Sequence, residues 1–69
     1  MKTAQVIKKI RNAAKDAGLE FSTKEGANHT KITVGGKTTT IGRHTETGDL
    51  MAKTIYKQLE GVLGEGWWR

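Results

Sequence analysis

Residues 29–41 read HTKITVGGKTTTI, and this stretch decides the fold. Both halves are rich in Thr, Ile and Val, which favour β-strands, and the Gly35-Gly36 pair between them can adopt the positive φ angles of a two-residue hairpin turn. Such a turn fixes the register of the two strands. The core-facing pairs are then Val34 with Lys37, Ile32 with Thr39, and Thr30 with Ile41. The solvent-facing pairs are Thr33 with Thr38, Lys31 with Thr40, and His29 with Gly42.

An amphipathic segment flanks this hairpin on each side. Over residues 3–17 the helical spacing predicts a helix that Gly18 ends, with its apolar stripe at Val6, Ile7, Ile10, Ala13, Ala14 and Ala17. From residue 47 onward the same spacing predicts a second helix, with its stripe at Leu50, Met51, Ile55, Leu59 and Val62. Thr47 is the expected N-cap of this helix, and Gly61 or Gly64 is its expected end. Residues 19–21 alternate apolar and polar side chains and predict a brief strand before a polar loop at 22–28.

The order of these elements is helix, two or three antiparallel strands, helix. It predicts a small α+β sandwich with both helices on one face of the sheet and the other face open. A chain of 69 residues has room for one core. We therefore expect a single domain over residues 1–63 and a C-terminal tail over residues 64–69. The Trp67-Trp68 pair in that tail could stack on nucleic-acid bases, pack on the domain, hold a partner chain or be disordered.

Composition narrows the functional classes. The chain has no cysteine, which excludes disulfide scaffolds, thiolate zinc sites and cysteine nucleophiles. It has no apolar run long enough for a membrane span and no signal-peptide pattern, so we expect a cytoplasmic protein and no membrane partner. Twelve Lys and Arg residues against seven Asp and Glu give a net charge of +5, which favours a polyanion as partner.

Several apparent motifs carry no function. The segment Gly36-Lys37-Thr38 resembles the end of a phosphate-binding loop, but Lys31 stands where that loop needs its first glycine. The histidines, His29 and His44, are far apart in the chain and share no helical face, so we expect neither a metal site nor any other cofactor. Ser22 is the sole serine and lacks the surroundings of a catalytic nucleophile.

His29 is the strongest candidate for chemistry, because the predicted register places its imidazole on the open sheet face among basic residues. Those neighbours are Lys24, Lys31, Lys37, Arg43 and His44. Neighbouring positive charges favour the neutral imidazole, which is the form that takes a proton from an RNA 2′-hydroxyl. Lys24 and Lys31 are then candidates to neutralise the scissile phosphate, with Arg43 as a further one. His44 or a water molecule would protonate the leaving oxygen.

Three segments in series resemble the HicA toxins of bacterial and phage toxin–antitoxin systems, over about residues 3–62. They are GANHTKI at 26–32, IGRH at 41–44 and KTIYKQL at 53–59. The resemblance implies an α-β-β-β-α fold like that of double-stranded-RNA-binding domains, with Gly26 and Asn28 in the loop before the catalytic histidine, here His29. It further implies metal-independent cleavage of mRNA without the ribosome, and silencing by a HicB-type antitoxin. Ala27 and Gly42 depart from the family, which usually has Ser and often Pro at these positions.

Two other readings fit the same residues. A non-catalytic RNA-binding module on this fold would use His29 for a hydrogen bond alone. An interaction protein would act through an acidic partner and would not retain RNA at any salt concentration.

Overall fold

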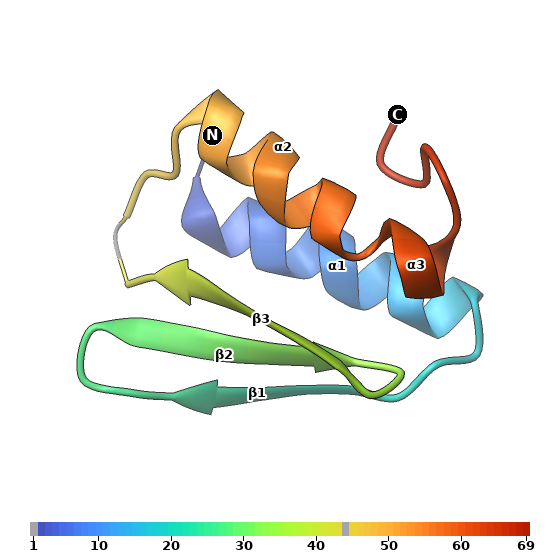
Figure 1. Cartoon of the computed structure of the whole chain (residues 1–69). Coiled ribbons are helices and arrows are strands. Elements are labelled where there is room, and N and C mark those ends of the chain that lie inside the picture. Colours follow the sequence, from blue (N-terminus) through green and yellow to red (C-terminus); the bar gives the residue numbers. More distant parts are fainter. Residues whose placement is uncertain (1, 44) are drawn as a thin grey trace.

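The structure is a computed structural model that describes residues 2–43 and 45–69 (Figure 1). Its elements are α1 (Thr3–Asp16), β1 (Phe21–Glu25), β2 (His29–Val34), β3 (Lys37–Gly42), α2 (Asp49–Gln58) and α3 (Glu60–Leu63). The order confirms the predicted α+β class, with an open three-stranded sheet. No helix in the described part of the chain is long and apolar enough to cross a membrane.

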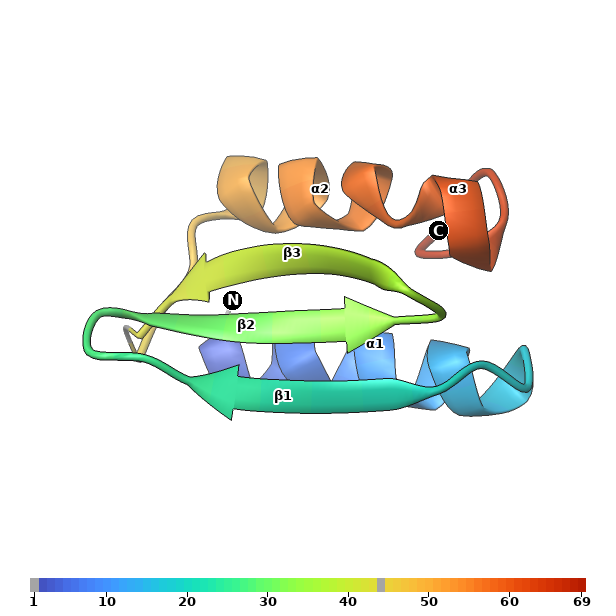
Figure 2. The same cartoon turned by 60° about the horizontal axis from the view of Figure 1, so that its bottom comes forward.

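The sheet is antiparallel in the order β1-β2-β3, and the hairpin forms with the predicted register. Gly35 and Gly36 have φ angles of 54° and 89°, as the two-residue turn requires. Figure 2 shows α1 and α2 side by side on one face of the sheet, with α1 toward β1 and α2 toward β3. The opposite face of the sheet has no helix over it, so side chains on that face meet solvent.

The core lies between the two helices and the sheet. Its buried apolar side chains are Val6, Ile10, Ala14, Ile32, Val34, Ile41, Ala52, Ile55, Tyr56 and Leu59. The apolar stripe predicted for the second helix was partly wrong, because Leu50 is 81% and Met51 57% exposed. Ala52 and Tyr56 take the inward positions instead, at helical spacing with Ile55 and Leu59. Helical spacing fits more than one stripe here, and contact with β3 selects the one that is buried.

The ends of the second helix also differ in part from expectation. Thr47 is not the N-cap, since Gly48 occupies that position. The Thr47 hydroxyl is instead buried in a 2.6 Å hydrogen bond with the Thr3 hydroxyl, which ties the start of α1 to the segment before α2. At the other end α2 stops at Gln58 with Leu59 as its C-cap, so neither Gly61 nor Gly64 ends it as predicted. Gly64, with a φ of 99°, ends the separate short helix α3 instead.

The strand predicted at residues 19–21 lies later in the chain, because β1 runs from Phe21 to Glu25 and pairs with β2 along its whole length. The loop shortens accordingly to residues 26–28. After Phe21 every residue of β1 is exposed, so the strand has no apolar alternation to reveal it. Its position depends on backbone pairing at the edge of the sheet, which hydropathy does not report.

The predicted C-terminal tail folds back onto the domain. Trp67 and Trp68 pack against the core, and the Trp67 indole N–H donates to the carbonyl of Tyr56 at 2.9 Å. The backbone N–H of Gly66 donates to a carboxylate oxygen of Glu60 at 2.8 Å. Residues 64–69 therefore belong to the packing of the domain.

Candidate functional site

The open face of the sheet is polar throughout. The register places on it Ser22, Lys24, His29, Lys31, Thr33, Thr38, Thr40 and Gly42. Because no helix covers this face, its strands need no apolar side chains there. Its chemistry is therefore set by one imidazole, two ammonium groups and a row of hydroxyls.

His29 is the first residue of β2, and its side chain is exposed as predicted. The residue opposite it is Gly42, which has no side chain to cover the ring. Within residues 2–43 and 45–69, no side chain or backbone group forms a hydrogen bond or ion pair with the imidazole. The ring is thus neither enclosed in the core nor held by a carboxylate.

A hollow of about 490 Å³ lies beside His29 on the open face. Besides His29 it is lined by Lys24, Glu25, Lys31, Thr40 and the loop at 26–28. Its volume falls within the range of about 300–1,000 Å³ typical of small-ligand sites. Lys24 and Lys31 are direct partners across β1 and β2, and like charges placed opposite each other destabilise a sheet. An anion bound between the two lysines would relieve that repulsion.

A second hollow of about 600 Å³ lies between β3 and α2. Among its lining residues are Thr54, Gln58 and the exposed Met51. His29 and Thr40 line this hollow as well as the first, so they form the wall between the two.

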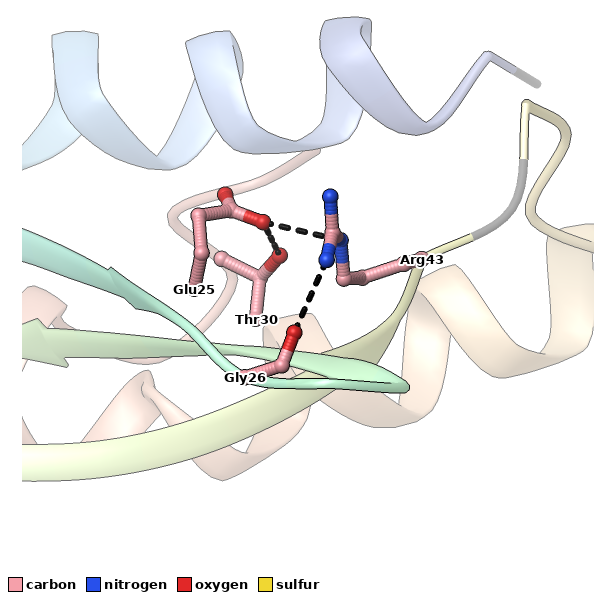
Figure 3. A network of polar contacts seen from close by, with 4 residues as sticks. All are labelled: Glu25, Gly26, Thr30 and Arg43. Carbon is pink, nitrogen blue, oxygen red and sulfur yellow. Dashed lines mark hydrogen bonds and ion pairs between the residues drawn. The ribbon is translucent and has the colours of Figure 1, made fainter.

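Arg43 does not lie where the phosphate-binding prediction required (Figure 3). Its Nε pairs with Glu25 Oε2 at 2.9 Å, and its Nη1 donates to the carbonyl of Gly26 at 2.8 Å. The Thr30 hydroxyl, which is buried on the core side, donates to the same Glu25 oxygen at 3.1 Å. Arg43 lines neither hollow. It therefore clamps the loop from the side of the sheet that faces the helices, away from His29.

The loop before His29 is shaped by two of the predicted residues. The Gly26 N–H donates to the carbonyl of His29 at 2.7 Å, and a Cβ at Gly26 would lie 3.0 Å from that same oxygen. The carbonyl of Asn28 accepts a hydrogen bond from the Arg43 backbone N–H at 3.1 Å. Position 26 therefore has space for glycine alone unless the backbone moves.

The remaining predicted neighbours of His29 divide into two cases. Lys37 pairs with Val34 at the opposite end of the hairpin, so the prediction that it lies near His29 was wrong. His44 lies outside the described residues. The predicted register had placed Thr40 opposite Lys31 on the open face, as observed, but neither Thr40 nor Glu25 was named as a site residue. In the described part of the chain, no group of three or more His, Cys, Asp or Glu residues could hold a metal ion.

No family model, curated protein or solved structure matches the chain. The resemblance to HicA toxins therefore stays a prediction.

Proposed function

We propose that the chain is an endoribonuclease in which His29 acts as the general base. One observation carries this proposal: an exposed imidazole without a polar partner among the described residues shares a hollow with Lys24 and Lys31. A base must reach the proton that it removes, and cations must lie where negative charge develops on the phosphate. This hollow supplies both on one surface.

The reaction follows from these groups. His29 takes the proton of a ribose 2′-hydroxyl, and the 2′-oxygen attacks the adjacent phosphorus. The bond from phosphorus to the 5′-oxygen breaks, which leaves a 2′,3′-cyclic phosphate on one fragment and a 5′-hydroxyl on the other. Lys24 and Lys31 stabilise the charge on the phosphate oxygens. The departing 5′-oxygen takes its proton from water or from His44.

The biological role we propose is that of a type II toxin that cuts mRNA and is inhibited by a HicB-type antitoxin over the His29 face. The exposed pair Leu50 and Met51 supports a protein partner, because adjacent large apolar side chains at the surface are typical of interaction sites. Met51 also lines the second hollow, which His29 shares. A partner seated there would reach the imidazole. The variant Leu50→Lys is then expected to weaken the complex while RNA cleavage by the free chain stays unchanged.

The test compares the wild type with His29→Ala and His29→Gln on a long RNA, in EDTA and without ribosomes. Loss of a general base is expected to lower the cleavage rate by about 10²–10⁴-fold in both variants. RNA affinity should change little. Glutamine matters because it keeps a hydrogen-bonding group but cannot take up the proton.

Two controls make the result decisive. RNA carrying 2′-O-methyl groups should bind but not be cut, since the attacking hydroxyl is blocked. Mass spectrometry of the products should find the cyclic phosphate and the 5′-hydroxyl. Cleavage that survives both substitutions at His29 would remove the catalytic assignment, and binding without any cleavage would favour the non-catalytic RNA-binding module.

A further inference from the structure

A cluster of aromatic and basic side chains lies at the other end of the molecule from His29. We call Tyr56, Trp67 and Trp68 the aromatic cluster. Trp67 meets Tyr56 edge to face with ring centroids 5.2 Å apart, and Trp68 stacks on Tyr56 with centroids 6.0 Å apart. Figures 1 and 2 both show the C-terminal segment beside α3, whereas His29 lies at the loop end of β2.

The cluster is held in place by its own polar groups. The Trp68 indole N–H donates to Glu60 Oε2 at 3.3 Å, and the Trp67 indole N–H donates to the backbone of α2. Both rings are only partly buried. The result is a fixed π surface that still reaches solvent, with its N–H groups already used within the chain.

Three cations gather around these rings. Lys9 lies 5.3 Å from the centroid of Tyr56, while Lys53 and Arg69 lie 5.9 Å and 5.2 Å from the centroid of Trp68. Lys53 and Arg69 are exposed, so their charged ends can move from the ring to another partner. In a chain of net charge +5 these cations repel one another, and an anion beside them would be favoured.

We propose that the aromatic cluster is a stacking site for an unpaired RNA base, with Lys53 and Arg69 binding the flanking phosphates. An aromatic face bordered by cations is the combination by which proteins bind single-stranded nucleic acid without sequence preference. The inference rests on the proposed function only in taking RNA as the ligand. It adds a second contact, away from His29, which holds the strand while the scissile phosphate lies between Lys24 and Lys31.

The experiment uses the fluorescence of the full chain, because both of its tryptophans belong to the cluster. The wild type is titrated with a single-stranded 2′-O-methyl oligonucleotide, which cannot be cut, and with an abasic oligonucleotide of the same length and charge. Stacking predicts that tryptophan fluorescence is quenched by the first and not by the second. Trp68→Ala is expected to weaken binding of the first by roughly 5- to 140-fold, the equivalent of one stacked base. Trp68→Phe should lose much less.

Each other outcome is informative. Equal quenching by the abasic oligonucleotide would overturn stacking, because phosphates alone would then explain the signal. Binding without quenching would place the RNA elsewhere and would overturn this inference while the proposal for His29 stands. Quenching by RNA in a chain that cuts nothing would support the stacking site and remove the nuclease. If a partner protein but not RNA changes the fluorescence, the cluster is a protein interface and the inference fails. Circular dichroism checks the fold of Trp68→Ala, and if that variant does not fold, the comparison of the two oligonucleotides on the wild type still tests the inference, because it needs no substitution.

Discussion

Substitution of Gly26 by alanine tests whether the loop before His29 positions the imidazole. The added Cβ would lie 3.0 Å from the carbonyl oxygen of His29, and both groups belong to the backbone. Gly26 has no positive φ, so alanine adds a close contact without strain at its own backbone. A shift of a few tenths of an ångström must follow, and it stretches the 2.7 Å hydrogen bond from the Gly26 N–H to the same oxygen.

Two magnitudes follow from this contact. Weakening of a partly exposed backbone hydrogen bond together with the tight contact should lower the free energy of unfolding by about 1–2 kcal/mol. A displacement of about 1 Å can cost a catalytic site about 10²-fold, so a few tenths should lower the cleavage rate by about 2- to 5-fold. Urea denaturation followed by tryptophan fluorescence measures the first quantity, and initial rates on a long RNA measure the second.

The matched control is Gly61→Ala, the same chemical change in α3, where an added Cβ would meet nothing within 4 Å. Alanine favours a helix over glycine, so this variant should gain about 0.5–1 kcal/mol in unfolding free energy and cut RNA at the wild-type rate. The reasoning fails if Gly26→Ala matches the wild type in both measurements. It also fails if the two alanine variants shift stability in the same direction by the same amount.

Three more predictions follow from other contacts. Burial raises the pKa of the Tyr56 phenol above its ordinary value of 10.0, so the folded chain keeps this proton longer than the unfolded chain. The stability that Tyr56 contributes is therefore complete below pH 10.0 and falls above it. An alkaline titration of the ultraviolet absorbance of this sole tyrosine should detect the raised pKa, and urea denaturation over the same pH range should detect the loss of stability. Arg43→Met should lower the cleavage rate, and it should lower the free energy of unfolding by about 1 kcal/mol or less because the ion pair it breaks is exposed. The salt dependence of RNA binding should stay unchanged, because the guanidinium faces away from the hollow. A smaller salt dependence would instead assign Arg43 to the phosphate site. Lys24→Ala and Lys31→Ala should each reduce the slope of log affinity against log salt by about 0.7 in a filter-binding assay. The control Lys37→Ala, at the far end of the hairpin from His29, should leave that slope unchanged.

The sequence predicted best those features that depend on neighbouring residues. The hairpin is one continuous segment with a two-residue turn, so its turn geometry sets the register without help from the rest of the chain. That register placed His29 and Lys31 on the open face correctly. The edge strand β1 was misplaced because nothing covers its residues after Phe21, which leaves it without an apolar signal.

Features that join distant parts of the chain were not predictable in the same way. Tyr56 is buried because the last residues fold back over it, and a helical pattern cannot report that contact. Arg43 is different, since the alternation that places Gly42 on the open face also turns the next residue toward the helices. Its pairing with Glu25 nevertheless required the correct bounds of β1.

The wall that His29 and Thr40 form between the two hollows has a practical consequence for inhibitor design. Two weakly binding fragments, one for each hollow, would meet at the same imidazole. If a short linker across that wall joined the two fragments, binding of the first would hold the second at a high effective concentration beside its own hollow. Such a bivalent molecule would approach the histidine from both sides, and the affinity it gains over either fragment would measure how rigidly the sheet separates the two hollows.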